Sequence, residues 1–350
     1  MLVVLAPLLL ASLIQGCLDI NTTTRVHPDG SLTRSVEISG DSSEVALGCR
    51  LMGIDSSWAQ MTDTAANHKP ALTATKQFRS YEEANKTLAG VPLKKIDIVL
   101  KLEKRFRWFT TIYRYEETWK RVYTFDHVPL SNYLSTWEID MFRSRMGRQD
   151  SIKTPGDKQA MEAAAKRAEK WVVRNFFEEY FSRVVDGVEM LNDPSLPVDS
   201  VLHAKPGIFA QAEELFEGDK WMANDSVQLV FVRELKNPAI RKAFEVNAAS
   251  LAEFKKFIKF VQDAGSPEYK VNAVVPGLIT DTNAGSVEGN KVRWVNFKEP
   301  VLYAEDYTMW VESRVVNWWM IMGTGLVVIA IGLMMVLGLV RNRRPGMVAA

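Results

Sequence analysis

The chain is poor in the residues that most often build metal and disulfide sites. Its 350 residues include only two cysteines and four histidines. Two cysteines cannot form a disulfide framework or a cysteine-rich zinc site. The histidines are far apart and outside the HxH and HExxH spacings that bind zinc. We therefore expect no metal site and no cofactor. The four histidines are His27, His68, His127 and His203.

An excess of charge of either sign is also missing. The sequence has 43 lysines and arginines against 42 acidic residues, so no global field favours nucleic acid or an acidic substrate. Basic residues do alternate with aromatic ones over residues 94–125, as they do in some proteins that bind single strands. A strand places such alternating residues on opposite faces of a sheet. We therefore expect a core face and a solvated face there, and no nucleic-acid partner.

Familiar catalytic motifs are absent from the sequence. It contains no GxSxG elbow, no P-loop and no dinucleotide fingerprint after a strand. The acidic neighbours Glu116-Glu117 and Glu178-Glu179 are candidates for paired carboxylates. Adjacent side chains diverge on a strand and on a helix, so neither pair is a convergent acid/base dyad. We predict a protein that is not an enzyme. A hydrolase with an unfamiliar site is the alternative, and it would need side chains from distant segments to converge.

What the sequence does have is an apolar run near each end. The run over residues 2–14 has the length of a signal-peptide core, shorter than the roughly 20 residues of a spanning helix. The second run carries no charge between Arg314 and Arg341 and is long enough to cross a bilayer. These runs predict a signal peptide over residues 1–16, an extracytoplasmic domain over 17–314, a transmembrane helix over 315–340 and a cytoplasmic tail over 341–350.

The flanks of the second run indicate its orientation. Trp318 and Trp319 stand at its front edge, where aromatic rings meet the membrane interface. Three arginines follow its rear edge, and the positive-inside rule places them in the cytoplasm. The expected location is therefore the plasma (inner) membrane of a bacterial cell envelope, with membrane lipid as a partner. The arginines are Arg341, Arg343 and Arg344.

The first run ends in a short box, Ile14-Gln15-Gly16-Cys17, which is similar to the signal of bacterial lipoproteins. Small residues give the peptidase access to the bond, and the thiol accepts the lipid. We predict lipidation at Cys17. An ordinary signal peptide that leaves a free thiol is the alternative. A eukaryotic type I membrane protein is a further one, because Asn21, Asn85 and Asn224 begin N-x-[ST] sequons.

The region between the two runs is typical of an α+β fold. Alternating residues on both sides of "HPDGS" predict a β-hairpin over residues 18–40, and a capped helix follows over residues 41–52. Long alternating strands occupy residues 94–125, and strand patterns resume over residues 268–316. Helical patterns lie between these two sets of strands. The fold class is therefore a mostly antiparallel sheet with a helical insertion at about residues 130–263, plus one C-terminal transmembrane helix.

The helical insertion contains one long helix and several short ones. The long helix begins near Pro155 and has Gly187 near its end. Shorter helices are expected over residues 129–146, 208–217, 238–246 and 250–265. Ser250 and Glu253 fit a capping box at the start of the last of them.

This last helix, "SLAEFKKFIKFVQDAG", is the best candidate for a surface contact. Basic residues beside an apolar stripe suit anionic headgroups or an envelope protein partner. A helix that packs on the sheet with its lysines in water explains the same pattern. The candidate contact residues are Phe254, Lys255, Lys256, Phe257, Lys259 and Phe260.

Both ends of the chain resemble a known family. A lipobox-like cysteine, a strand, a "PDGS" turn and a second strand open the chain, and "VVPGLITDTNAGSVEGNKVRW" and an arginine-flanked membrane helix close it. These features resemble the LppM-type bacterial envelope lipoproteins, over about a third of the chain. The resemblance implies an extracytoplasmic α+β domain and an interaction with lipid or a host envelope, and it transfers no active-site residue.

Together these patterns predict a membrane-anchored envelope lipoprotein whose extracytoplasmic domain binds lipid or a protein partner without catalysis. An accessory subunit of a larger membrane transport or assembly complex is an alternative, in which the C-terminal helix packs against other chains.

Overall fold

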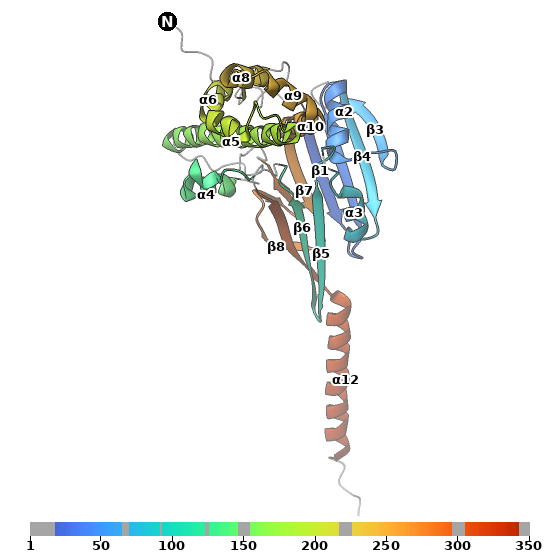
Figure 1. Ribbon diagram of the computed structural model, residues 1–350. Coiled ribbons are helices and arrows are strands. Elements are labelled where there is room, and N and C mark those ends of the chain that lie inside the picture. Colours follow the sequence, from blue (N-terminus) through green and yellow to red (C-terminus); the bar gives the residue numbers. More distant parts are fainter. Residues whose placement is uncertain are drawn as a thin grey trace, which may run out of the picture.

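The computed structural model describes residues 18–64, 70–91, 93–122, 126–145, 155–216, 226–295 and 305–342. It shows two β-sheets, a layer of helices and an apolar helix that projects from the body (Figure 1). The helical layer and the projecting helix lie at opposite ends of the sheets. The mixed helices and mostly antiparallel strands confirm the predicted α+β class.

The larger sheet has the strand order β3-β4-β2-β1-β7-β10-β9. Neighbouring strands in this sheet run antiparallel, except for β1 and β7, which run parallel. The parallel pair is possible because the helical layer returns the chain to the start of β7. The predicted hairpin around "HPDGS" forms β1 and β2. The strands are β1 (Asp19–Val26), β2 (Leu32–Ser39), β3 (Ala59–Thr64), β4 (Pro70–Phe78), β7 (Glu268–Val274), β9 (Ser286–Glu288) and β10 (Lys291–Trp294).

The smaller sheet has the strand order β5-β6-β11-β8 and is antiparallel throughout. Strands β5 and β6 are the long aromatic strands expected from the sequence, joined by a two-residue turn. Strand β11 crosses the middle of this sheet and leads into the projecting helix after one residue, Asn317. The strands are β5 (Ile98–Arg107), β6 (Thr110–Trp119), β8 (Leu278–Thr282) and β11 (Tyr307–Val316).

Strand alternation gives each sheet a buried face and a solvated face. On β1 and β2 the buried face includes Ile20 and Ile38, which pair across the strands, while Asn21 and Glu37 pair on the outer face. The buried face of β6 includes Tyr115, and it packs against the buried face of the larger sheet in one core cluster. The two sheets therefore form a sandwich.

Two helices, α2 (Ser42–Met52) and α3 (Tyr81–Leu88), pack against the sandwich. Asp41 caps α2 by accepting hydrogen bonds from the backbone N–H groups of Ser43 and Glu44, and the Glu44 carboxylate accepts a bond from the N–H of Asp41. This capping box confirms the predicted helix. Cys49 is half-buried on this helix and packs against the core, and burial raises the pKa of its thiol.

The helical layer occupies the chain between β6 and β7. Its centre is a cluster of aromatic rings from five helices, including Phe177, Tyr180, Phe231 and Phe254. The long helix begins at Pro155, as predicted. The helices are η1 (Leu130–Asn132), α4 (Thr136–Arg145), α5 (Pro155–Leu191), α6 (Val198–Phe216), α8 (Ser226–Leu235), α9 (Ala239–Val246) and α10 (Ala248–Gly265).

Two local details of this layer differ from expectation or extend it. The predicted capping box at Ser250 is wrong, because α10 begins earlier, at Ala248, and the Ser250 hydroxyl accepts a hydrogen bond from Arg183 instead. Gly187 lies four residues before the end of α5 and is buried. A side chain there would meet the carbonyl oxygen of Ala243 at 2.6 Å, so glycine permits close packing of α5 on α9.

Candidate functional site

The projecting helix α12 (Trp318–Asn342) is the most unusual surface of the molecule. The most apolar 18-residue window of this helix has a mean hydropathy of 2.5, and only 6% of that window is buried. At 1.5 Å per residue its 25 residues extend about 37 Å, more than the hydrocarbon thickness of about 30 Å. Length and composition make it a candidate membrane span, as the sequence predicts.

The predicted interface residues lie at the two ends of this helix. Trp318 and Trp319 form its first turn and are 67% and 64% exposed. Arg341 falls in its last turn, while Arg343 and Arg344 lie outside the described residues. Cys17, the predicted lipidation site, also lies outside them, directly before Leu18.

Asn317 joins α12 to the sandwich, and sequence reasoning missed it. Its carbonyl oxygen accepts hydrogen bonds from the N–H groups of Met320 and Ile321, at 3.0 and 3.2 Å, and so starts the helix. Its side chain is buried, accepts a bond from the Thr111 hydroxyl at 3.0 Å and donates to the carbonyl of Arg107 at 2.8 Å. An asparagine before a long apolar run is a recognisable helix-start signal. These bonds hold α12 in one orientation to the sheets.

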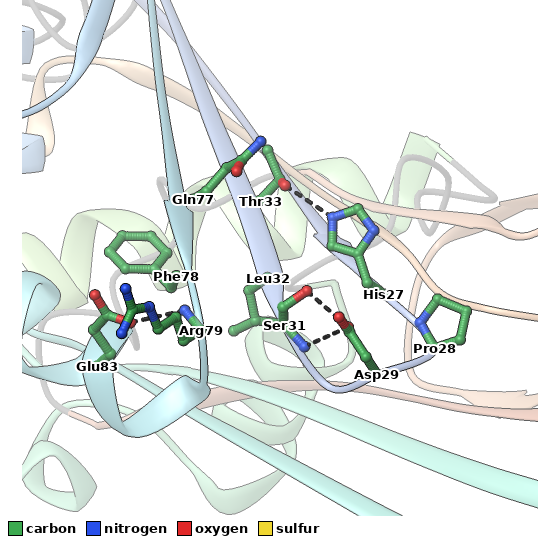
Figure 2. Close-up of a pocket in the computed structure, with 10 residues that line it drawn as sticks. All are labelled: His27, Pro28, Asp29, Ser31, Leu32, Thr33, Gln77, Phe78, Arg79 and Glu83. Carbon is green, nitrogen blue, oxygen red and sulfur yellow. Dashed lines mark hydrogen bonds between the residues drawn. The ribbon is translucent and has the colours of Figure 1, made fainter.

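The turn between β1 and β2 lines an open hollow (Figure 2). Its volume is about 760 Å³. Asp29 accepts hydrogen bonds from the N–H and hydroxyl of Ser31, at 2.9 and 2.7 Å, and these bonds lower the pKa of Asp29. Gly30 completes the turn at a φ of 99°, which suits glycine. The lining residues are His27, Pro28, Asp29, Ser31, Leu32, Thr33, Gln77, Phe78, Arg79 and Glu83.

Seven of the ten lining residues are polar, and several of their groups bond to one another. Nε2 of His27 lies 2.8 Å from the Thr33 hydroxyl, and the Glu83 carboxylate accepts a bond from the N–H of Arg79 at 2.7 Å. The lining residues Gln77 and Arg79 are both exposed. Because the hollow is open, it suits a polar group of a ligand better than an acyl chain, which needs an apolar enclosure.

The hollow lies towards the end of the sandwich from which α12 leaves. The carbonyl oxygen of Pro28 accepts bonds from Nζ of Lys104, at 2.6 Å, and from the Tyr113 hydroxyl, at 2.8 Å. Both donors stand on the β5–β6 hairpin within a few residues of its turn, and that turn contacts Asn317. The β1–β2 turn, the β5–β6 turn and the start of α12 therefore share one end of the domain.

A buried ion pair occupies the centre of the sandwich. Both guanidinium nitrogens Nη1 and Nη2 of Arg34, on β2, donate to the carboxylate of Glu117, on β6, at 3.0 and 2.9 Å, and both side chains are fully buried. Tyr115 and Trp119 also donate to this carboxylate. Thr24 accepts a bond from Arg34. The pair therefore joins the two sheets.

Burial and pairing act in opposite directions on these two groups. Burial raises the pKa of Glu117, but the Arg34 charge and the hydrogen bonds it receives outweigh that effect and lower the pKa overall. Burial likewise lowers the pKa of Arg34, and the carboxylate raises it overall. Both groups therefore stay charged. Glu116 points to the opposite face of β6 and pairs with Arg114, so the acidic neighbours diverge as expected.

The predicted contact segment on α10 lies with its aromatic side chains inward. Phe254 and Phe260 are buried, in the helical cluster and in the sandwich cluster respectively, and Phe257 is half-buried. Lys256 and Lys259 are exposed, and Lys255 is half-buried. The helix therefore links the two cores and presents lysines outward, which matches the packing alternative. Its contact with lipid or a partner stays a prediction.

Of the histidines, the structure brings one to a carboxylate from a distant segment. Nε2 of His127 lies 2.8 Å from Glu179, which also accepts two bonds from Arg183. His203 bonds to a backbone carbonyl of its own helix, and His68 lies outside the described residues. Within the described ranges, no group of three or more histidine, cysteine or acidic side chains is placed to hold a metal ion.

Comparisons with known proteins add one structure. No protein-family model and no curated protein matches the chain. Among solved structures it is similar to the folded domain of the Mycobacterium tuberculosis LppM protein, determined by NMR. The match covers 86% of this chain and 91% of that one, with 8% sequence identity and a TM-score of 0.28. This is a weak resemblance, and no functional statement rests on it. Fold and site define an α+β protein with a candidate membrane helix at its C-terminal end.

Proposed function

We propose that the chain is a membrane-anchored, non-catalytic binding protein of a bacterial cell envelope. The observation that carries this proposal is α12, an apolar helix of spanning length whose surface is exposed and which follows β11 after a single buried residue. An exposed apolar surface of that length is unfavourable in water, and a bilayer would cover it. The domain would then stand on the membrane surface.

The arginines behind α12 support an orientation. Arg341, Arg343 and Arg344 follow the apolar run, while the other end of the run meets the folded domain. By the positive-inside rule the tail faces the cytoplasm and the domain faces away from it.

The hollow beside the β1–β2 turn is the proposed binding surface. It lies at the end of the domain that would face the bilayer, and its lining residues Gln77 and Arg79 are exposed. Its seven polar lining residues suit a lipid headgroup or a polar segment of an envelope protein. The sandwich core is filled by large side chains such as Trp119 and Trp294, so acyl chains are not expected between the sheets.

The fold separates the two anchors that the sequence predicts. The carbonyl of Leu18 accepts a bond from Glu268, at the end of the sheet where Trp119 contacts Tyr269, whereas α12 starts beside Thr111. Strand β6 connects these ends over ten residues, about 30 Å. One leaflet is about 15 Å deep. A lipid attached to the residue before Leu18 would therefore start about 30 Å from the first turn of α12, and α12 is the proposed anchor.

Membrane extraction and labelling test the anchor. Full-length protein should stay with membranes after washing at alkaline pH, and a Cys17→Ala variant should stay as well. Labelling with a radioactive fatty acid should be lost in that variant and retained in Cys49→Ser. Release of the wild-type protein by the alkaline wash would contradict anchoring by α12. Fatty-acid labelling that Cys17→Ala leaves unchanged would contradict lipidation at Cys17.

A photoreactive residue tests the binding surface. Placed at Gln77 in the full-length protein, it should crosslink to a lipid headgroup or to one defined envelope protein in intact membranes. The control position is Met190, which is 63% exposed at the end of α5 in the helical layer. Equal crosslinking at both positions would contradict the hollow as a binding site. A large complex that repeatedly co-purifies in mild detergent, without hollow-specific crosslinks, would instead favour the accessory-subunit alternative.

A further inference from the structure

The turn of the β5–β6 hairpin carries aromatic side chains in an unusual position. Trp108 and Phe109 are the two residues of the turn, and Phe106 precedes them on β5. They are 58%, 50% and 57% exposed. A turn in water is normally built from small or polar residues. Three exposed rings at the tip of the longest hairpin therefore indicate a non-aqueous environment.

The tip lies beside the first turns of α12. Nε1 of Trp108 donates to the hydroxyl of Thr324 at 2.9 Å, and the ring of Phe106 stacks on Trp319 with centroids 6.3 Å apart. Thr324 is six residues after Trp318, about 9 Å further along the helix axis. If α12 spans a bilayer, the Trp108 ring therefore reaches below the start of the apolar span.

The backbone carbonyls of the tip have the hydrogen-bond partners that a lipid environment requires. Carbonyl groups without partners cost several kcal/mol each in hydrocarbon. At this tip Asn317 donates to three successive backbone carbonyls. Its side-chain amide donates to the carbonyls of Arg107, at 2.8 Å, and Trp108, at 3.5 Å. Its backbone N–H donates to the carbonyl of Phe109, at 2.9 Å. One residue therefore satisfies the acceptors that a lipid environment would leave unpaired.

Basic side chains lie next to the aromatic residues of the tip, an arrangement that suits a membrane surface. Arg105 and Arg107 precede the tip on β5 and are exposed, and Arg105 also pairs with Glu103. Basic side chains next to inserted aromatic rings suit the headgroup layer, where they meet lipid phosphates. Trp318 and Trp319 complete a belt of rings around the start of α12.

We propose that the β5–β6 tip is a second membrane contact, inserted into the same leaflet as the first turns of α12. This inference rests on the proposed anchoring by α12. The occupant of the aromatic surface is the bilayer itself, since the hydrogen bond to Thr324 holds Trp108 against a helix segment that would lie in lipid. Two contacts fix the tilt of the domain, so the hollow at His27 and Arg79 is held close to the headgroups.

Depth-dependent quenching tests the proposal on the full-length chain. In a Cys17→Ser, Cys49→Ser background, a single cysteine replaces Phe109 and carries an environment-sensitive fluorophore. The protein is reconstituted into vesicles of phosphatidylcholine and phosphatidylglycerol. Val327→Cys in α12, 58% exposed, reports on the span, and Met190→Cys reports on the distant helical layer.

The probe at position 109 should emit at shorter wavelength than the probe at 190. It should also lose more emission to a nitroxide high on the acyl chain than to one at the chain end. The probe at 327 should be quenched more by the deeper nitroxide. A probe at 109 that behaves like the one at 190, while 327 is quenched, overturns insertion of the tip and leaves the anchor intact. Absence of quenching at both 109 and 327 overturns the anchor and the insertion together.

A second pair of variants guards against an effect of the label. Phe109→Ser and Trp108→Ser change exposed side chains and leave the bonds of Asn317 to the backbone in place. Both should raise the access of a water-soluble quencher to the remaining interface tryptophans, whereas Leu229→Ser, on the exposed face of α8, should not. Equal access in all three proteins would overturn the proposal.

Discussion

The cores of the sandwich and of the helical layer differ in the side chains at their centres. The sandwich holds a fully buried ion pair, Arg34 and Glu117, with neighbouring hydroxyl groups at its centre. The helical layer has an aromatic and aliphatic centre in which Phe231 contacts Tyr180 and Phe244. Helix α10 connects the two, since Phe254 belongs to one cluster and Phe260 to the other.

The two regions also differ in what sets the relative position of their packed elements. Two sheets with apolar faces can slide over each other at small cost, and a bidentate ion pair permits one relative position. The aromatic rings of the helical layer pack in one arrangement because of their shape, and this arrangement does not require an ion pair. We infer that the ion pair sets the register of the sheets, and through it the position of the β5–β6 tip beside α12.

The largest expected effect comes from removing one charge of the pair. Glu117→Leu leaves the Arg34 guanidinium buried without a counter-charge, and we expect a loss of about 3–5 kcal/mol in the free energy of unfolding. Urea unfolding of the full chain in detergent, followed by tryptophan fluorescence, measures it. Glu116→Leu, on the outer face of the same strand, is the control and should cost less than about 1 kcal/mol.

The double variant Arg34→Met with Glu117→Leu tests whether the lost stability comes from an unpaired buried charge. Replacement of both charges by apolar side chains should recover most of the lost stability, because no charge is then left buried. Equal losses in Glu117→Leu and Glu116→Leu would contradict a specific role for the pair.

Acid should act on the same group. The pKa of Glu117 is lowered in the folded state, so the unfolded chain binds this proton first. The stabilisation is therefore fully present above the ordinary glutamate pKa of about 4.3 and is lost as the pH falls through the folded value. Unfolding free energies of the wild type and Glu117→Gln, measured from neutral to acid pH, should converge as the pH falls. A constant gap would contradict the prediction.

Truncation in the helical layer should have a smaller effect than loss of the charge. Ile240 on α9 is fully buried, and Ile240→Ala should cost about 3 kcal/mol through lost burial and a cavity. Val246→Ala at the exposed end of the same helix is the control. If Ile240→Ala produces a separate early transition, the helical layer unfolds independently of the sandwich. A single shifted transition would show that α10 couples the two cores.

The smallest effect is expected at the close approach of α5 and α9. Gly187→Ala would place a methyl group 2.6 Å from the carbonyl oxygen of Ala243. The crowding costs about 1–3 kcal/mol, and the higher helix propensity of alanine returns about 1. Thermal unfolding should show a net loss of about 1 kcal/mol, and Glu189→Ala in the same turn should be neutral. A stabilised Gly187→Ala would contradict tight packing here.

Much of the fold could be predicted because its signals are local. The "PDGS" turn, the Asp41 cap, Pro155 and the apolar run of α12 each depend on neighbouring residues. Helix α8 was missed although Val227, Val230 and Phe231 recur at helical spacing. Strand β3, with the sequence AQMTDT, was missed because it has no clear apolar alternation.

The candidate site was less accessible to such reasoning. Parity along β2 and β6 does place Arg34 and Glu117 on apolar faces, so the sequence contains a sign that each is buried. That they meet depends on the packing of two sheets from segments 83 residues apart. The bond of Asn317 to Arg107 joins segments 210 residues apart.

Many of the helical and strand segments, the turns and the apolar span follow from the sequence alone, because periodicity and capping act between close neighbours. The tertiary structure alone decided three things: the closure of the sandwich on an ion pair, the placement of aromatic turn residues beside α12, and the separation of Leu18 from that helix. Each depends on strand order and sheet packing, and residues distant in sequence become neighbours only when the sheets close.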